Sequence, residues 1–374
     1  MNQKLIGGVI LGVITVLMAI MLNVESKEPY SNDKATIKIG ATLPLSGQMN
    51  YIGQSSKNTL QMALNEWKKR GSRYNYELIF EDDAMEPKKV NRNVNRLVNI
   101  EKADAVLTVL TPAATEANTI TNDKKVIHVS CSYGDREAEG IYSFNNMTSN
   151  EAMAKLLLKN LKEKEVTSLA ILVSIDENSR RQTNALEKLL RQDGKIRITS
   201  KKVYPAGTKN FEKIINSMLK DGKPDLFYVN GVTPDAALVA RDLKKVTGEV
   251  KLTTINDFIE DKNRDIFNGL LFVASGGPTE VFSDKYAEQF GEPLYLCAPN
   301  SYDSLNLLIW AYEHTPKRKG ELQPRNEDVV KTILEIKDWH GALGVLTVSP
   351  DGRLISKPVW AVVSNGRVKK ISAY

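Results

Sequence analysis

Small polar residues follow the expected strands at four places, each time where a strand gives way to a helix. The first place is residues 44–47 (Pro-Leu-Ser-Gly) with Tyr51 close behind, and the second is residues 111–115 (Thr-Pro-Ala-Ala-Thr). The serine offers a hydroxyl, the glycine lets a backbone approach closely, and the tyrosine offers a flat face. Thr111 is predicted to cap a helix that has Pro112 at its first position, and such a helix start suits a carboxylate.

The third place is residues 130–134 (Ser-Cys-Ser-Tyr-Gly), and the fourth is a group in the second half of the chain. That group comprises residues 176–179 (Asp-Glu-Asn-Ser), 230–231 (Asn-Gly) and 256–257 (Asn-Asp). Ser and Thr after a strand often serve only as helix caps, and Gly often serves only a turn. Because ligands bind beyond the carboxyl ends of parallel strands, the recurrence of such residues in both halves favours one shared site for a small molecule.

The motifs of several enzyme classes are absent from the sequence. No G-x-G-x-x-G follows a strand, and no G-x-S-x-G elbow occurs. Gly222-Lys223 is followed by Pro224, where a phosphate-binding loop needs Ser or Thr. No nucleophile, base and orienting group come together in the sequence, which therefore predicts a protein that is not an enzyme.

Metal and acid/base chemistry are also poorly supported. The three histidines lack the spacing of metal ligands, and His128 lies in an apolar strand as a core residue would. The pair Asp82-Asp83 is interpreted as a cap of the helix that starts near Pro87 and not as an acid/base pair. We therefore expect neither a metal nor a cofactor.

The elements that must position these residues alternate between strand and helix. In the first half, strands are predicted at residues 37–43, 76–83, 104–110 and 126–130, and helices at 60–67, 90–98 and 112–121. The rhythm restarts near residue 152, with strands predicted at 168–174, 196–203, 225–231, 250–255 and 268–275 and helices between them. Two series of β-α-β units predict an α/β fold with two Rossmann-like lobes, each built on a parallel sheet.

The end of the chain has a different pattern. A clear helix face occurs at residues 305–312, and two hairpin signals follow, Asp351-Gly352 and Asn365-Gly366, each between apolar strands. With 374 residues, the chain is long enough for two lobes.

The net charge of +6 does not indicate a nucleic-acid-binding protein. The short basic runs at residues 68–70, 88–89 and 244–245 lie in or beside predicted helices and alternate with acids, as solvated helix faces do. Cys131 and Cys297 are too few for a disulfide framework. We expect two free buried thiols, with a single bridge as the alternative.

The N-terminus predicts export. Leu5–Leu22 is an uncharged apolar run of 18 residues preceded by Lys4. The run fits either a cleaved signal peptide within residues 1–28 or an uncleaved membrane anchor. In both cases Lys4 stays inside, and the rest of the chain lies in the periplasm or at the extracellular face of the membrane.

Several ordered motifs resemble one family. "IKIGATLPLSGQMNYIGQSSKNTLQMALNEW" looks like the opening of the type I periplasmic binding proteins of the leucine/isoleucine/valine-binding group. "FEDDAMEPKKVNRNVNRLV", "DAVLTVLTPAATEA", "NSYDSLNLLIWAYE" and "WHGALGVLTVSPDGR" resemble later segments of the same proteins in the same order. The resemblance covers roughly residues 36 to 370, and it implies two lobes that are joined by three crossings of the chain.

The resemblance also implies how an α-amino acid would be held. Hydroxyls and N–H groups of the first lobe would meet its carboxylate, and an acid of the second lobe would meet its ammonium group. The usual serine after the third strand is Pro112 here, so Ala113, Ala114 and Thr115 would supply the donors. The position of that acid falls at Asn256 or, one residue later, at Asp257, and we expect Asp257 to balance the buried cation.

We therefore expect an exported solute-binding protein that closes by hinge motion on an amino acid or related compound for an ABC transporter permease. The alternative is a membrane-tethered sensor module that signals through a partner. The first lobe is predicted at residues 36–150 and 276–330, and the second at 151–275 and 331–374. The candidate ligand-binding residues are Ser46, Gly47, Tyr51, Thr111, Ala113, Ala114, Ser132, Tyr133, Asn178, Asn230 and Asp257.

Overall fold

The computed structural model describes residues 34–134, 139–231, 234–255, 264–364 and 367–371. The chain divides into two units, Met1–Ala35 and Thr36–Tyr374, and all the elements named below lie in the second. The run Leu5–Leu22, predicted to be a signal peptide or an anchor, lies outside the described residues. Within the described part of the chain, no helix is both long and apolar enough to cross a bilayer.

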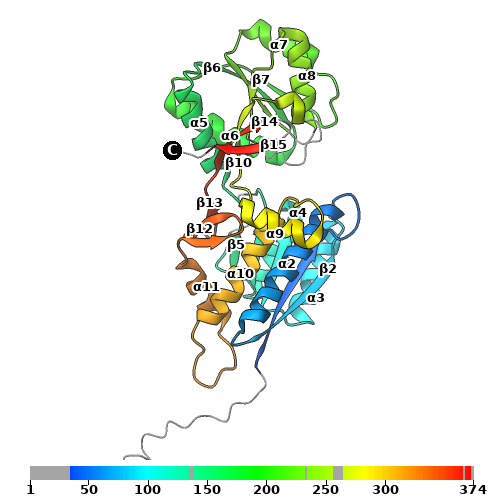
Figure 1. Cartoon of the computed structure of the whole chain (residues 1–374), viewed down its shortest axis with the longest axis vertical. Helices are drawn as coiled ribbons and strands as arrows, with labels where there is room; N and C mark the ends of the chain where they lie inside the picture. Colours follow the sequence, from blue (N-terminus) through cyan, green and yellow to red (C-terminus); the bar gives the residue numbers. More distant parts are fainter. Residues whose placement is uncertain (1–33, 135–138, 232–233, 256–263, 365–366, 372–374) are drawn as a thin grey trace, which may run out of the picture. The chain divides into compact units, whose positions relative to one another are not determined.

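A five-stranded parallel sheet with the order β2-β1-β3-β4-β5 forms the core of the first lobe (Figure 1). Strands β3 and β4 are buried along their whole length, as expected for strands covered on both faces. The apolar face predicted for residues 90–98 is buried as well. The elements are β1 (Thr36–Leu43), α2 (Asn50–Arg70), β2 (Asn75–Asp82), α3 (Pro87–Asn99), β3 (Ala105–Val109), α4 (Thr111–Asp123), β4 (Ile127–Cys131) and β5 (Ser143–Asn145).

A second parallel sheet, with the order β7-β6-β8-β9, forms the core of the second lobe. Its central strand β6 is fully buried and separates two apolar clusters, one on each face of the sheet. The elements are α5 (Asn150–Glu163), β6 (Ser168–Ser174), α6 (Glu177–Asp193), β7 (Arg197–Tyr204), α7 (Glu212–Asp221), β8 (Leu226–Asn230), α8 (Asp235–Thr247), β9 (Leu252–Thr253) and the 3-10 turn η2 (Arg264–Phe267).

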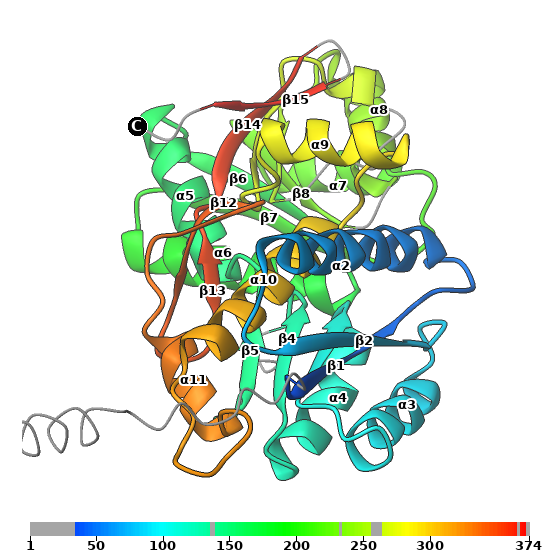
Figure 2. The ribbon, with the colours of Figure 1, turned by 60° about the horizontal axis from the view of Figure 1, so that its bottom comes forward.

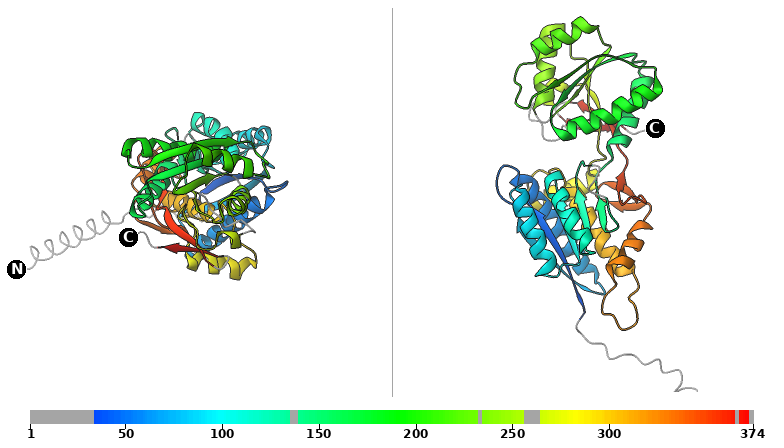
Figure 3. Two further views of the ribbon diagram at one scale, coloured as in Figure 1. Left: turned by 90° about the horizontal axis from the view of Figure 1, so that it is seen from above. Right: turned by 180° about the vertical axis from the view of Figure 1, so that it is seen from behind.

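The rest of the chain returns to both lobes. Strands β10 (Leu271–Ala274), β14 (Val359–Ser364) and β15 (Arg367–Ile371) form an antiparallel sheet whose apolar residues join the core of the second lobe. Helices α9 (Glu280–Phe290) and α10 (Ala298–His314) pack on α2 instead, as Figure 2 shows for α10. Figures 1 and 3 also show α9 and α10 with the first lobe and the C-terminal strands β14 and β15, in red, with the second.

The predicted hairpin at Asp351-Gly352 is present. It joins β12 (Gly344–Val348) to β13 (Leu354–Ser356), and β11 (Trp339–Gly341) completes a small antiparallel sheet after α11 (Asn326–Leu334). Strands β14 and β15 pair up to Ser364 and Arg367, and the predicted turn between them lies outside the described residues.

The contacts of residues 339–356 run to the first lobe. Asp303 of α10 accepts hydrogen bonds from the N–H groups of Ala342 and Leu343, at 2.6 and 2.9 Å. The Asn145 N–H, at the end of β5, bonds the Gly352 carbonyl at 2.9 Å. The predicted lobe boundary at residue 330 does not allow for these contacts. Of the described residues that follow α11, those that pack with the second lobe are 359–364 and 367–371.

The chain passes three times between the lobes, between β5 and α5, between β10 and α9, and between β13 and β14. The Thr148 and Ser356 hydroxyls of two crossings lie 2.5 Å apart, and both residues are buried. Lys370 of β15 donates to the Pro278 carbonyl of the third crossing at 2.6 Å. Two α/β lobes joined by three crossings confirm the fold class predicted from the sequence.

Candidate ligand-binding site

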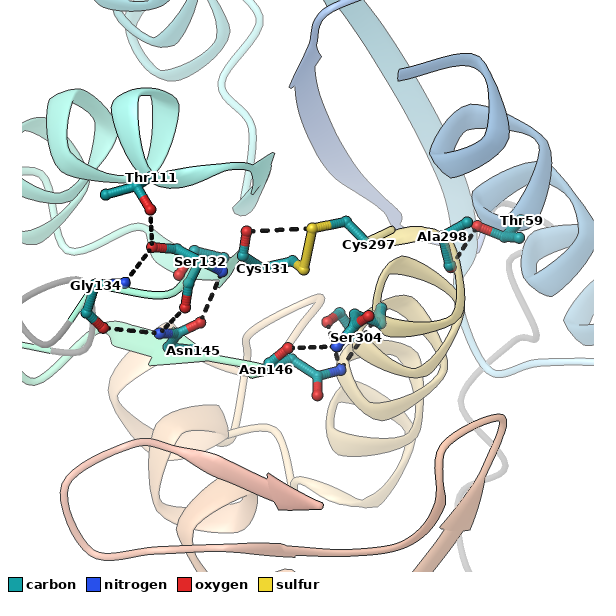
Figure 4. The surroundings of a disulfide bond; sticks show 12 residues. Thr59, Thr111, Cys131, Ser132, Gly134, Asn145, Asn146, Cys297, Ala298 and Ser304 are labelled. Carbon is teal, nitrogen blue, oxygen red and sulfur yellow. Dashed lines mark hydrogen bonds between the residues drawn. A yellow bond between two sulfur atoms is a disulfide. The ribbon is translucent and has the colours of Figure 1, made fainter. Parts of the chain in front are cut away.

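The segment that follows β4 is held in place by Asn145, the last residue of β5. The Ser132 N–H donates to Asn145 Oδ1 at 3.2 Å, and Asn145 Nδ2 donates to the Ser132 carbonyl at 2.8 Å (Figure 4). Asn145 is fully buried, so its carboxamide has no competing water. Both backbone groups of Ser132 are therefore fixed by one side chain, which the sequence alone did not indicate.

The hydroxyls of Ser132 and Thr111 meet at the carboxyl edge of the first sheet. Ser132 Oγ donates to Thr111 Oγ1 at 3.2 Å, and it accepts from the Gly134 N–H at 3.1 Å. Because Thr111 Oγ1 accepts this bond, its own hydroxyl hydrogen is available to a further acceptor. Two residues predicted to bind ligand are thus in direct contact, although they come from different strand–helix junctions.

Helix α4 begins one residue earlier than predicted. Its N-cap is Leu110, with a left-handed φ of 69°, so Thr111 is the first helical residue and not the cap. The Leu110 N–H bonds the Cys131 carbonyl at 2.8 Å, and this bond from β3 to β4 fixes the start of the helix.

The donors at this helix start differ from those expected. Ala113 and Ala114 are both buried, and the Ala114 N–H already bonds the Leu110 carbonyl at 3.1 Å. Pro112 has no N–H. The N–H groups of Thr111 and Ala113 precede the first bond of the helix, so they are the backbone donors that could face an anion.

A disulfide bond closes the same edge. Cys131 and Cys297 are bonded, with Cα atoms 5.7 Å apart, and they are 166 residues apart in the sequence. The expectation of two free thiols is therefore wrong. The fold places the end of β4 beside the start of α10, and no local sequence pattern predicts this contact. The bridge fixes the residue directly before Ser132.

The first predicted junction, residues 44–47, is bound to the end of β2. Asp82 Oδ1 accepts the N–H groups of Leu45, Ser46 and Ala84 at 2.9, 3.1 and 3.0 Å. Burial alone would raise the pKa of Asp82, but the Ser46 hydroxyl and these N–H groups together outweigh burial and lower the pKa. Ser46 therefore turns its N–H to the protein, and the interpretation of Asp82 as a cap of α3 is wrong, because Glu86 holds that position.

The other predicted residues of this junction are Gly47, which is exposed with a φ of 77°, and Tyr51, whose ring meets Tyr295 edge to face at 4.9 Å. Gly53 is required by packing, since a Cβ there would lie 2.1 Å from the Pro44 carbonyl oxygen. The start of α2 thus lies directly on the turn.

Asp82→Ala is expected to loosen this turn without unfolding the lobe. Three N–H groups would lose a half-exposed acceptor, so we expect amide exchange at Leu45, Ser46 and Ala84 to accelerate about tenfold. Exchange measured by NMR or mass spectrometry tests this. Glu86→Ala, which removes an exposed carboxylate nearby, should leave those amides unchanged, and equal effects of the two variants would contradict the role of Asp82.

In the second lobe, Asn230 is engaged by its neighbours. The side chain is 2% exposed, and its Nδ2 donates to Gln182 Oε1 and to the Tyr228 hydroxyl, both at 2.9 Å. Just beyond it, the Tyr204 hydroxyl bonds Asp235 Oδ2 at 3.0 Å. A Cβ at Gly231 would lie 1.9 Å from that hydroxyl, so glycine is needed there.

Asn178 lies on the first turn of α6, next to the N-cap Asp176. Asp176 Oδ1 accepts the Ser179 N–H at 2.9 Å. Asp176 Oδ2, Asn178 Oδ1 and, at the end of β9, Thr254 Oγ1 are buried without a hydrogen-bond partner among the described residues. Buried oxygens of this kind call for a donor. Asp257 lies outside the described residues.

Within the described ranges, no group of three or more His, Cys, Asp or Glu could hold a metal ion. His128 is a core residue, fully buried, with its Nε2 2.9 Å from Thr108 Oγ1 and its pKa lowered by burial to about 3. A surface hollow of about 380 Å³ lies elsewhere, between Trp310 and residues 335–340, and contains none of the predicted site residues.

Two α/β lobes, three crossings between them and polar residues at the carboxyl edge of the first sheet are together typical of the periplasmic binding proteins. The sequence profile of the periplasmic binding proteins matches residues 36–367, and the chain belongs to that family. The resemblance to the type I proteins of the leucine/isoleucine/valine-binding group is confirmed.

Three similar proteins illustrate the range of the group. The Leu/Ile/Val-binding protein BraC3 of Rhizobium johnstonii is 26% identical over 352 residues, which cover 86% of this chain and 90% of that protein. LivJ of Streptococcus pneumoniae, in complex with isoleucine, is 18% identical, with a TM-score of 0.74 over 90% of this chain and all of that one. A solute-binding protein of Rhodopseudomonas palustris, in complex with 3,4-dihydroxybenzoic acid, is 17% identical, with a TM-score of 0.73 over 91% of this chain and 97% of that one.

Proposed function

We propose that the protein is an exported solute-binding protein that captures a small carboxylate-bearing ligand, an amino acid or related compound, between its lobes and delivers it to an ABC transporter permease. The contact between Ser132 and Thr111 at the start of α4 carries this proposal. Isoleucine and 3,4-dihydroxybenzoic acid, the ligands of two similar proteins, both have a carboxylate. We expect this edge to hold a carboxylate, because the N–H groups of a helix start and a hydroxyl suit that group.

The donors of the first lobe have the right chemistry for that group. The Thr111 hydroxyl, together with the N–H groups of Thr111 and Ala113, supplies neutral donors at the positive end of a 13-residue helix. Of the other predicted first-lobe residues, Ser46 and Gly47 are exposed and would act through their position at the same edge of the sheet.

The second lobe would close on the remainder of the ligand. Asp176 Oδ2 and Asn178 Oδ1 are acceptors without donors, so a ligand that carries an ammonium or hydroxyl group would satisfy them. Asp257 stays our proposed counter-ion for an ammonium group. From the packing contacts, we take the first lobe as residues 36–145 and 279–356, and the second as 150–275 and 359–371.

The proposal predicts that amino acids raise the melting temperature of the protein, because a ligand that binds only the folded state stabilises it. A thermal-shift screen should include each amino acid, its amide and aromatic acids, with hits measured by calorimetry. We expect leucine-type ligands or benzoates to bind and their amides to fail. No shift with any carboxylate would contradict the proposal.

Ser132→Ala is expected to weaken binding of the hit roughly 10- to 100-fold, because the Ser132 hydroxyl fixes that of Thr111 as a donor to the carboxylate, and hydrogen bonds to a charged group are worth about 1.5–3 kcal/mol. The matched control is Thr199→Ala, which removes a hydroxyl bonded to the Leu169 carbonyl in the second sheet. Unchanged affinity of Ser132→Ala, with the carboxylate still required, would remove this serine from the site.

A further inference from the structure

Tyr133 directly follows Ser132, and its ring and its carbonyl contact the other lobe. Its half-buried ring packs against the apolar cluster of the second lobe, which includes Met153 and Leu157 of α5. Its carbonyl accepts from Asn150 Nδ2 at 3.3 Å. Asn150 is the first residue of α5 and is 5% exposed. One residue of the first lobe thus reaches the first helix of the second.

The residues on the N-terminal side of Tyr133 are fixed to the first lobe. Cys131 is bonded to Cys297, and Asn145 bonds both backbone groups of Ser132. The crossing beside them is fixed as well, because Asn146 Nδ2 donates to the Asn300 carbonyl at 2.9 Å. Tyr133 is the first residue of this segment whose contacts leave the lobe.

We propose that Tyr133 is a positioning residue that couples Ser132, whose hydroxyl orients that of Thr111, to the placement of the second lobe, and that it does not contact the ligand. The inference rests on the proposed function for the role of Ser132. Because Cys131 is immobilised by the disulfide, a shift of the Ser132 side chain on ligand binding would pass along the chain toward Tyr133. There the ring and the carbonyl transmit it to α5, beside the Thr148–Ser356 contact of the crossings.

The predicted ligand contact of Tyr133 and the positioning role proposed here depend on different parts of its side chain. A polar contact with the ligand would use the phenolic hydroxyl. The positioning role uses the packing of the ring on the second lobe. Tyr133→Phe keeps that packing and removes the hydroxyl, whereas Tyr133→Ala removes both. The pair of variants therefore separates the two roles.

The test measures the distance between the lobes directly. Spin labels are placed at the exposed residues Lys319 and Lys223, each replaced by Cys, one in each lobe. The described cysteines are both in the disulfide, so the labels attach to the introduced thiols. Without ligand, we expect Tyr133→Ala to broaden the distance distribution relative to wild type and Tyr133→Phe to reproduce the wild-type distribution.

With the ligand found by the thermal-shift screen, we expect Tyr133→Ala to raise the dissociation constant about tenfold, mainly through faster release, and to reduce closure. Tyr133→Phe should stay within about twofold of wild type. Leu189→Ala is the matched control, because it removes a partly buried side chain from the same cluster on α6. It should change neither the distances nor the affinity.

Two results would overturn the inference. Equal loss of affinity in Tyr133→Phe and Tyr133→Ala would show that the hydroxyl contacts the ligand. An unchanged distance distribution in Tyr133→Ala would show that the ring does not position the second lobe. If wild type binds no carboxylate, the proposed function fails, and the ligand-free distances still decide whether Tyr133 positions the second lobe.

Discussion

Removing the Cys131–Cys297 bridge is expected to lower the free energy of unfolding by roughly 5 kcal/mol, the largest single effect that we predict. The bridge joins residues 166 positions apart, and in the chain-entropy description a loop of that length gives about 5 kcal/mol. Both side chains are buried, at 3% and 1% exposure. Both cysteines are therefore replaced by alanine, because serine would bury two hydroxyls. We expect the melting temperature to fall by about 10 °C.

Unfolding in urea, with and without reductant, checks this expectation. Wild type treated with reductant in denaturant and then refolded should match the variant Cys131→Ala/Cys297→Ala, and the variant itself should not respond to reductant. A difference of less than about 1 kcal/mol between wild type and variant would contradict the stabilising role of the bridge.

The bridge also bears on ligand capture, because it immobilises the residue before Ser132. The double variant should therefore bind the ligand more weakly even at temperatures where it is fully folded. Asp225→Ala provides a control of lower stability alone, since Asp225 accepts the N–H groups of Thr167 and Ser168 far from the first sheet. That variant should melt earlier and bind normally.

Local patterns were sufficient for most of the fold. The strands and helices could be predicted because apolar residues repeat every second or every third to fourth position, as in α3, and because Asp351-Gly352 has few conformations other than a turn. The carboxyl ends of the strands then indicated where polar residues would gather, and the contact between Ser132 and Thr111 agrees with that expectation.

The features that the sequence did not predict are pairings between distant segments. The sequence does not predict that Cys131 and Cys297 are bonded, because free and bonded cysteines occur in similar apolar surroundings. Asp82 looked like a helix cap because a helix follows it, but its oxygen accepts N–H groups from a turn 36 residues earlier. Tyr133 is predicted to contact the ligand because of its place after a strand, and no local pattern indicates that its ring packs on the second lobe.

The same limitation explains the predicted lobe boundary at residue 330. Residues 339–356 have the strand pattern of either lobe, and their place depends on contacts with distant segments, among them a buried carboxylate. Asp303 lies on α10 and is fully buried, and its two oxygens accept the Ala342 and Leu343 N–H groups. No local pattern predicts this contact, which spans about 40 residues.

Asp303→Ala is therefore expected to destabilise the protein by roughly 2–5 kcal/mol, because two buried N–H groups would lose their acceptors. Urea unfolding at pH 7 measures this change. Asp351→Ala, in the neighbouring hairpin, removes a mostly exposed carboxylate and should change the free energy of unfolding by less than about 0.5 kcal/mol. Similar values for the two variants would show that Asp303 does not hold the late hairpin on α10.

Asp303→Asn tests the charge of the same group. Burial raises the pKa of Asp303 to about 7, against the opposing effect of its two N–H donors, whereas an aspartate in an unfolded chain has a pKa of about 4. Between these values the folded protein holds a proton that the unfolded chain has lost, so the contribution of Asp303 to the free energy of unfolding decreases as the pH rises. Asparagine does not titrate. The free energy of unfolding of wild type minus that of Asp303→Asn should therefore decrease from pH 4 to pH 7 and level off above it. Parallel pH profiles would mean that this carboxyl is ionised throughout the range and that its two N–H bonds outweigh its burial.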